Sequence, residues 1–158
     1  MAIDAGTPSP SFRLVRGDGE DFTEADLIGR TTVLVFYPFA FSPVCTDQLQ
    51  VYEPLVAELA GRDGVLCGVS CDSPYSQTAF REKLGISSEQ LSDFEPKGAT
   101  CAAFGVLHPG GFPERALVIT GPDGVVRWSY QAESPGELPS LELLRSGIDV
   151  AYGDGAGA

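Results

Sequence analysis

The stretch from Tyr37 to Leu49, YPFAFSPVCTDQL, constrains the fold of this chain more than any other. An apolar run of β-forming residues, Thr31–Tyr37, leads into it, and a helical pattern begins at Cys45. A buried strand would therefore deliver Cys45 to the first turn of a helix, where backbone N–H groups lack helical partners and the dipole is positive. That environment favours a thiolate over a thiol. The alternative is that Cys45 is a small buried hydrophobic residue without chemistry.

The segment that follows Cys45 has apolar residues on one face of a helix. They recur at steps of three and four residues: Cys45, Leu49, Tyr52, Val56 and Leu59. Pro54 interrupts this pattern, and proline cannot donate the backbone hydrogen bond that a helix interior needs. The sequence therefore predicts either a kink at Pro54 or two helical pieces that meet there.

The rest of the chain alternates strand and helix patterns. We expect strands at Phe12–Val15, Asp21–Thr23, Val65–Ser70, Leu91–Phe94, Arg115–Thr120 and Val125–Gln131, and helices at Pro74–Leu84, Ala99–Phe104 and Glu137–Ile148. Thr31–Tyr37 is apolar on both faces, as central parallel strands are. The turn at residues 17–19 joins the first two strands into a hairpin. This order predicts an α/β protein with a thioredoxin-like fold, in which helices flank a mixed central sheet and a β-hairpin precedes it.

The length and charge of the chain limit its organisation and its partners. We expect one domain over residues 1–150 and a disordered tail over 151–158. The formal net charge of −12 argues against nucleic acid or an anionic membrane as a partner. The longest apolar run, Val33–Phe41, is too short to span a bilayer. The N-terminus has no signal-peptide pattern, so we predict a cytoplasmic location.

The four cysteines, Cys45, Cys67, Cys71 and Cys101, are widely spaced. There is no C-x-x-C pair, so the spacing predicts no zinc site, and nothing else in the sequence indicates a metal or another cofactor. Permanent disulfides are unusual in the cytoplasm. The sequence thus predicts one reactive thiol and three structural ones.

Three residues around the reactive cysteine carry a resemblance to a known family. Pro38, Ser42 and Cys45 match the pattern Pro-x-x-x-Thr/Ser-x-x-Cys, which resembles the active-site signature of the peroxiredoxins. Further similarities are Leu91–Phe94, Ala103–Val106, Arg115–Ile119 and Asp123–Gly124, so that the resemblance runs from about residue 12 to residue 137. Among the branches of the family, the chain is most similar to the one-cysteine alkyl hydroperoxide reductase E group, through Ala40–Ser42 and Pro135–Glu137.

The resemblance implies that the Cys45 thiolate attacks hydrogen peroxide or an organic hydroperoxide and becomes a sulfenic acid. It implies that Ser42 and the N–H groups of Val44 and Cys45 bind the peroxide. Arg115 would supply positive charge to the thiolate and to the transition state, and Pro38 would exclude water. Full ionisation of a free cysteine, of pKa about 8.5, gains at most roughly thirtyfold at pH 7. Positioning and charge stabilisation must supply any larger acceleration.

Two of these assignments are weaker. Gln48 matches a position where the family carries a polar side chain, which makes it a candidate for substrate binding or a plain surface residue of the helix. Ser42 stands where most members have threonine, so the hydroxyl is kept but the methyl group that restricts its rotamer is absent. Taken singly, Pro38 could simply end a strand, and Arg115 could pair with an acid.

The spacing of the cysteines favours a one-cysteine cycle, in which a thioredoxin- or glutaredoxin-like protein or a small thiol reduces the sulfenic acid. Two-cysteine relatives carry a resolving cysteine five residues after the nucleophile, in the next helix, or near the C-terminus. Here those places hold Gln50, the cysteine-free helix Pro74–Leu84, and a tail without cysteine. Cys71 is the best internal candidate for a resolving cysteine, because it ends a strand at the same sheet edge as Cys45. Cys101 is the next.

The resemblance also implies a homodimer that associates through loops around the active site. Candidate apolar contacts are Phe39, Phe41, Phe94 and Trp128. Two other functions remain open for a chain with this pattern. A redox sensor or holdase would use the same oxidation of Cys45 without turnover, and a structural domain would have an unreactive Cys45. A thioredoxin-type disulfide reductase needs a second cysteine at position 42, which is serine.

Overall fold

The apolar stretches of the chain form seven strands of one mixed sheet in the computed structural model, which describes residues 1–153. The strands are β1 (Arg13–Arg16), β2 (Asp21–Thr23), β3 (Thr31–Phe36), β4 (Gly64–Ser70), β5 (Glu89–Ser92), β6 (Ala116–Thr120) and β7 (Val126–Gln131). Their order across the sheet is β2-β1-β5-β4-β3-β6-β7. The three central strands β5, β4 and β3 are parallel, and the outer strands join them antiparallel. The mixed sheet and the N-terminal hairpin confirm the predicted thioredoxin-like architecture.

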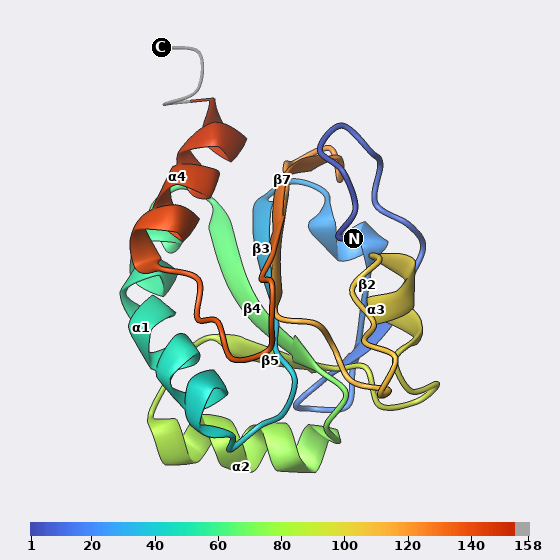
Figure 1. Ribbon diagram of the computed structural model, residues 1–158. Coiled ribbons are helices and arrows are strands. Elements are labelled where there is room, and N and C mark those ends of the chain that lie inside the picture. Colours follow the sequence, from blue (N-terminus) through green and yellow to red (C-terminus); the bar gives the residue numbers. More distant parts are fainter. Residues whose placement is uncertain (154–158) are drawn as a thin grey trace.

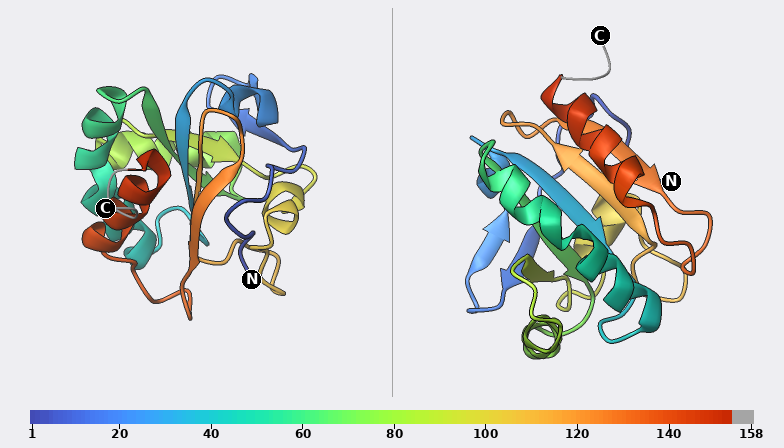
Figure 2. Two further views of the ribbon diagram at one scale, coloured as in Figure 1. Left: turned by 90° about the horizontal axis from the view of Figure 1, so that it is seen from above. Right: turned by 90° about the vertical axis from the view of Figure 1, so that its left-hand side faces the viewer.

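Helices connect the strands and form the outer layers. Within the described residues they are the 3-10 helix η1 (Glu24–Leu27) and the α-helices α1 (Pro43–Ala60), α2 (Pro74–Leu84), α3 (Ala99–Ala103) and α4 (Leu141–Tyr152). Figure 1 and the left view of Figure 2 show α1 and α4 on one side of the sheet and α3 on the other. The central strand β3 is therefore covered on both faces, as its lack of alternation predicts.

Each face of the sheet has its own hydrophobic core. Alternate residues of β3 divide between them, because successive side chains of a strand point to opposite faces. Val33 and Val35 join the core under α1 and α4, which also contains Cys45. Leu34 and Phe36 join the core on the α3 side. This division decides which cysteines can meet.

The first helix is continuous, and this corrects one of the alternatives for Pro54. The structure contains one helix, Pro43–Ala60, that runs through Pro54 rather than two helical pieces. Its buried residues Leu49, Leu55 and Leu59 pack on the sheet on both sides of the proline. This packing keeps the helix together where proline removes one backbone hydrogen bond.

The last helix is shifted relative to the prediction. It spans Leu141–Tyr152 rather than Glu137–Ile148, because the Ser140 hydroxyl accepts the Leu143 N–H at 3.0 Å and so caps its N-terminus. The helix continues to residue 152, two residues beyond the expected end of the domain, and the rest of the expected tail, residues 154–158, lies outside the described residues. Trp128 of β7 packs under this helix, where a Cβ atom on Gly147 would come within 2.5 Å of the indole.

None of the helices in the part of the chain that the structure describes combines the length and the apolar character that a membrane span requires.

Candidate active site

The loop between β3 and α1 is held in an uncommon conformation. Phe41 has a φ of 69°, in the left-handed region that bulky residues rarely adopt. Asp72, just beyond the end of β4, fixes this loop: its Oδ2 accepts the Ala40 N–H at 2.8 Å and the Ser70 hydroxyl at 2.7 Å. The strand ends therefore set the point at which α1 begins.

Cys45 is the third residue of α1 and is fully buried. The Thr46 N–H donates to the Ser42 carbonyl at 2.9 Å, so the N–H groups of Val44 and Cys45 precede the first helical hydrogen bond. The Ser42 hydroxyl does not cap the helix but donates to the Phe39 carbonyl at 2.9 Å. The backbone donors that the sequence assigned to peroxide binding are thus at the start of α1, next to the thiol.

Arg115 reaches Cys45 because of the register of two antiparallel strands. Ala116, the first residue of β6, pairs with Phe36, the last residue of β3. The residue before it, Arg115, therefore lies at the edge of the sheet from which the active-site loop departs. Its Nη2 atom donates to Cys45 Sγ at 3.2 Å. The side chain is only 2% exposed, which places a buried positive charge against the sulfur.

Gln48 positions Arg115. Gln48 is fully buried, and its Oε1 accepts a hydrogen bond from Arg115 Nη1 at 2.6 Å. A second acceptor, the Pro135 carbonyl, binds Arg115 Nε at 2.7 Å. The guanidinium is therefore fixed at three of its nitrogens, with Cys45 as one of the three partners. In this structure the side-chain oxygen of Gln48 contacts the arginine, and its contact with substrate stays a prediction.

Tyr52, whose helical spacing predicts only a core residue, completes this network. Gln48 Nε2 donates to the Tyr52 hydroxyl at 3.4 Å, and that hydroxyl donates to the Pro139 carbonyl at 2.5 Å. Burial raises the pKa of Tyr52 to about 12, so the phenol stays neutral and keeps its proton for Pro139. The signal that could have found it is its spacing, four residues after Gln48 on the same helix face.

A cavity of about 310 Å³ opens beside this network. Its walls are mainly apolar and come from Pro38, Phe39, Pro43, Val44, Phe112, Pro135 and Gly136. Ser42 and Arg115 supply its polar groups. Four of the residues predicted from the sequence, Pro38, Ser42, Val44 and Arg115, therefore meet around one space, and Cys45 lies behind it in contact with the arginine. An apolar pocket with a few converging polar groups suits a small ligand that has one polar end.

The other three cysteines lie in the other core. Cys67, Cys71 and Cys101 belong to the cluster on the α3 side of the sheet, whereas Cys45 belongs to the cluster under α1 and α4. Cys71 is at the end of β4, as predicted, but it points to the opposite face from Cys45. The fold brings Cys71 close to Cys101 and Asp93 instead, with the donor atoms of the three side chains within 4.8 Å of one another.

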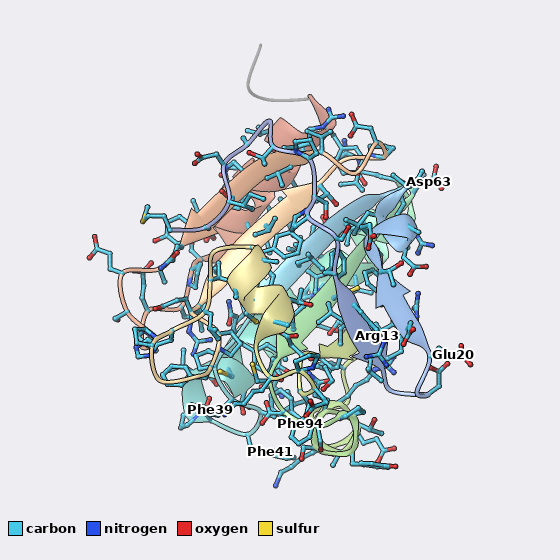
Figure 3. The ribbon with its side chains drawn as sticks, turned by 90° about the vertical axis from the view of Figure 1, so that its right-hand side faces the viewer. Arg13, Glu20, Phe39, Phe41, Asp63 and Phe94 are labelled. Atoms are coloured by element: carbon cyan, nitrogen blue, oxygen red, sulfur yellow. The ribbon has the colours of Figure 1, made fainter. Side chains whose placement is uncertain are left out.

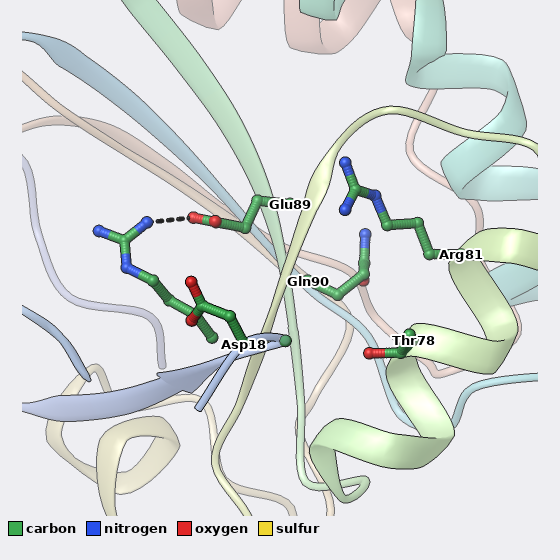
Figure 4. A pocket seen from close by; sticks show the side chains of 7 residues that line it. Asp18, Thr78, Arg81, Glu89 and Gln90 are labelled. Atoms are coloured by element: carbon green, nitrogen blue, oxygen red, sulfur yellow. Dashed lines mark hydrogen bonds and ion pairs between the residues drawn. The ribbon is translucent and has the colours of Figure 1, made fainter. Parts of the chain in front are cut away.

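A second cavity, of about 320 Å³, lies between the β1–β2 turn, α2 and β5 (Figure 4). Asp18, Thr78, Arg81 and Gln90 line it, together with an ion pair of 2.7 Å between Arg16 and Glu89. Its lining contains no cysteine, and two of its charged groups, Arg16 and Glu89, pair with each other. We therefore place the chemistry of the molecule at Cys45.

Comparison with known proteins gives sequence relatives along most of the chain. The sequence model of the AhpC/TSA family matches residues 5–129. A relative from Clostridium pasteurianum, described as a putative peroxiredoxin in a rubredoxin operon, is 31% identical in an alignment of 141 residues that covers 78% of this chain and 76% of that protein. Alkyl hydroperoxide reductase E of Mycobacterium tuberculosis is 26% identical over 143 residues, or 89% of this chain and 93% of that protein.

Solved structures share the fold. AhpC of Mycobacterium tuberculosis superposes with a TM-score of 0.86 at 21% identity and covers 98% of this chain and 96% of its own. AhpC of Enterococcus faecalis gives a TM-score of 0.82 at 26% identity, with 99% of both chains covered. The similarity extends over the sheet and both helical layers.

Proposed function

Because the chain belongs to the AhpC/TSA family of peroxiredoxins and is a thiol-dependent peroxidase, we propose that Cys45 reduces hydrogen peroxide and organic hydroperoxides and that an external thiol then restores it. The observation that carries this proposal is the contact of 3.2 Å between Arg115 Nη2 and the sulfur of Cys45, at the start of α1. A buried thiol in contact with a fixed guanidinium is a nucleophile rather than core filling.

The surroundings of Cys45 suit a peroxide. The peroxide oxygens would occupy the space next to Arg115, where the Val44 and Cys45 N–H groups and the Ser42 hydroxyl can bind them. An organic substituent would lie against Phe39, Phe112 and the other apolar walls of the cavity. The volume of about 310 Å³ accommodates a substituent of several carbon atoms as well as hydrogen peroxide.

The reaction is a two-electron transfer. The Cys45 thiolate attacks one peroxide oxygen, the O–O bond breaks, and the leaving oxygen takes a proton to become water or an alcohol. Cys45 is oxidised to a sulfenic acid. Negative charge moves from sulfur to the leaving oxygen, and Arg115 lies close to both, so it stabilises the transition state without being rearranged.

The positions of the other thiols support a one-cysteine cycle. Cys71 and Cys101 belong to the core on the opposite side of the sheet, so neither can bond to Cys45 without disrupting that core. A disulfide requires Cα atoms roughly 4.4–6.8 Å apart and side chains directed toward each other. The sulfenic acid therefore waits for a thioredoxin- or glutaredoxin-like protein or for a small thiol.

Intact-mass measurement tests this cycle. One equivalent of peroxide is added to the reduced protein, with and without a sulfenic-acid trap, and modified peptides are mapped. We expect a trapped adduct on Cys45. A loss of two hydrogens that maps to a bond between Cys45 and Cys71 or Cys101 of the same chain would overturn the one-cysteine assignment.

A reductant panel separates this function from a redox sensor or holdase that uses the same cysteine. Peroxide consumption is followed with thioredoxin, a glutaredoxin-like protein and small thiols side by side. A peroxidase consumes many equivalents with at least one of them, and the reductant that gives the fastest turnover identifies the partner. A sensor would consume one equivalent and stop with every reductant.

The proposal includes a homodimer and a cytoplasmic location. Phe39, Phe41 and Phe94 are each about half exposed, and Figure 3 shows them at the same end of the molecule. Trp128, the fourth candidate, packs under α4 and is not part of this surface. Sedimentation analysis should show a dimer that Phe94→Glu weakens and Tyr75→Glu, at an 88% exposed position of α2, leaves intact. A monomer at all concentrations would contradict the dimer.

The cytoplasmic location rests on a separate observation. The four free thiols fit a reducing compartment.

A further inference from the structure

The register of two parallel strands places Cys71 beside Asp93. Ser70, the last residue of β4, pairs with Ser92, the last residue of β5. The next residues, Cys71 and Asp93, therefore leave the sheet side by side, and the Asp93 N–H donates to the Ser70 carbonyl at 2.8 Å.

Asp93 then brings Cys101 to the same place. Its two carboxylate oxygens accept the N–H groups of Thr100 and Cys101, at 3.0 and 2.8 Å, and so hold the start of α3. The sulfur atoms of Cys101 and Cys71 lie within 4.8 Å of each other. Two thiols that are 30 residues apart in the sequence (101 − 71) thus lie against each other on the α3 side of the sheet.

The pair is not equivalent to a metal site. Among the described residues, one group of three histidine, cysteine, aspartate or glutamate side chains has its donor atoms close enough to share a metal ion. It consists of Cys71, Asp93 and Cys101. Each oxygen of Asp93 already accepts a backbone hydrogen bond, so the carboxylate serves as the cap of α3. Two thiols remain, which is fewer than the three or four protein ligands that zinc sites use.

Cys71 faces open space, and Cys101 lies behind it. Cys71 lines a cavity of about 410 Å³ together with Lys97, whereas Cys101 is fully buried. Pro38, Phe39 and Phe112 line both this cavity and the one beside Cys45, and the rings of Phe39 and Phe112 pack at a centroid distance of 4.9 Å. Cys71 thus lines one of two adjoining cavities, and Arg115, which contacts Cys45, lines the other.

We propose that Cys71 and Cys101 form a second redox centre, independent of Cys45, which small peroxides convert into an intrachain disulfide. The two thiols have distinct roles. The neighbouring Cys101 thiol lowers the pKa of Cys71, against the opposing effects of burial and of Asp93. The interaction with Cys71, together with burial, raises the pKa of Cys101. Cys71 is therefore the thiolate that faces the cavity, and Cys101 keeps its proton.

The oxidation is balanced with peroxide as the only oxidant. The Cys71 thiolate attacks a peroxide oxygen, the O–O bond breaks, and the leaving oxygen takes a proton and departs as water or alcohol. Cys101 then attacks the sulfur of the Cys71 sulfenic acid. The S–O bond breaks, the oxygen leaves as water with the Cys101 proton, and the disulfide remains. Overall, two thiols lose two electrons and two protons to one peroxide.

This centre is tested in a protein that lacks the first one. The Cys45→Ser variant, which has three thiols (4 − 1), is reduced, treated with excess hydrogen peroxide under native conditions, and analysed by intact mass and nonreducing peptide mapping. We expect the loss of two hydrogens, a fall from three titratable thiols to one, and a peptide pair joined through Cys71 and Cys101. The test uses no Cys45 chemistry, so its failure would leave the assignment of Cys45 unaffected.

Second substitutions in Cys45→Ser identify the role of each thiol. A further Cys67→Ala change, in the same core but away from the pair, should leave the disulfide unchanged. Cys101→Ala should stop oxidation at a sulfenic acid that a trap labels on Cys71, whereas Cys71→Ala should leave Cys101 reduced. Three intact thiols in Cys45→Ser after peroxide, a disulfide that contains Cys67, or a trapped adduct on Cys101 would each overturn the proposal.

Discussion

Cys45 and Cys67 are both fully buried, yet their surroundings differ in almost every other respect. Cys67 is inside β4, between Leu34 of β3 and Glu89 of β5, and its side chain lies in an apolar core. Burial raises the pKa of Cys67 to about 12. Cys45 lies at the start of a helix with Arg115 Nη2 at 3.2 Å.

The contrast shows that burial alone does not decide the reactivity of a thiol. Burial without a charged partner penalises the thiolate, whereas burial with a fixed guanidinium strengthens an interaction that water would otherwise weaken. The elements that carry the two cysteines produce this difference. A strand interior offers no free backbone donors, because its N–H groups are paired in the sheet, whereas the first turn of a helix does.

The largest expected effect comes from exchanging the two thiols for serine in turn. Cys45→Ser removes the nucleophile, so rapid peroxide reduction should fall to the background rate of the assay. Cys67→Ser should keep the rate of the first step, because Cys67 lies in the core on the other side of the sheet from Cys45, and Arg115 contacts Cys45. Stopped-flow measurement of peroxide consumption distinguishes the two variants. Retained fast consumption in Cys45→Ser would remove Cys45 from the reaction.

The next largest effect is expected from Arg115, and it tests whether this arginine makes Cys45 more reactive with peroxide than Cys67. Arg115→Met keeps much of the side-chain volume but loses the charge and the hydrogen bond to sulfur. Hydrogen bonds to charged groups contribute about 1.5–3 kcal/mol, so the rate constant with peroxide should fall roughly 10- to 100-fold. Arg115→Lys should restore part of it, because a point charge cannot reproduce the planar fork.

A matched control for Arg115 is available on the neighbouring strand. Arg127 of β7 pairs with Asp123 at 3.0 Å on the surface, and Arg127→Met should leave the rate unchanged. Circular dichroism would confirm that each variant is folded. Equal rates for Arg115→Met and the unmodified protein would show that the guanidinium contact has no part in the reaction.

A smaller effect is expected from Gln48, which acts through Arg115. Gln48→Ala removes the acceptor at 2.6 Å, so the guanidinium should lose its fixed position. We expect a roughly 2- to 10-fold lower rate constant, since one such hydrogen bond contributes about 0.5–1.5 kcal/mol. Gln48→Glu keeps an acceptor oxygen and should retain more activity than Gln48→Ala. If Gln48 had a purely structural role, this difference between the two variants would not be expected. Gln50→Ala, two residues away and exposed, is the control.

The sequence was sufficient for the parts of the site that depend on local order along the chain. The strand Thr31–Tyr37, the prolines and the helix start at Cys45 follow from periodicity and from the chemistry of proline. The family resemblance added the roles of Pro38, Ser42 and Val44, which line one cavity in the structure. Arg115 was identified only through a family resemblance, because nothing local to it indicates a partner 70 residues away (115 − 45).

The features that the sequence did not reveal depend on which face of the sheet a side chain occupies. Cys71 is at the predicted edge but in the opposite core from Cys45, and strand periodicity does not relate the face of one strand to that of another. The role of Gln48 required the path of Arg115 to be known. The start of α4 at Leu141 depended on the cap formed by Ser140, although Glu137 looked equally helical. The first two features are results of tertiary packing, whereas the start of α4 is set by a local cap.

The smallest effect concerns stability and leaves the peroxide reaction unchanged. Because the pKa of Cys67 rises from 9.0 in the unfolded chain to about 12 in the folded one, the folded state holds its proton at a pH where the unfolded state has lost it. The contribution of Cys67 to stability is fully present below pH 9 and declines as the pH rises toward 12. From these two values the loss at pH 9.5 is about 1 kcal/mol. Urea unfolding at pH 7.5 and pH 9.5 measures it as a difference between the unmodified protein and Cys67→Ala, so that tyrosine and lysine titration cancels. The variant should lose less stability over this interval by that amount, and the same loss in both proteins would mean that Cys67 is not desolvated.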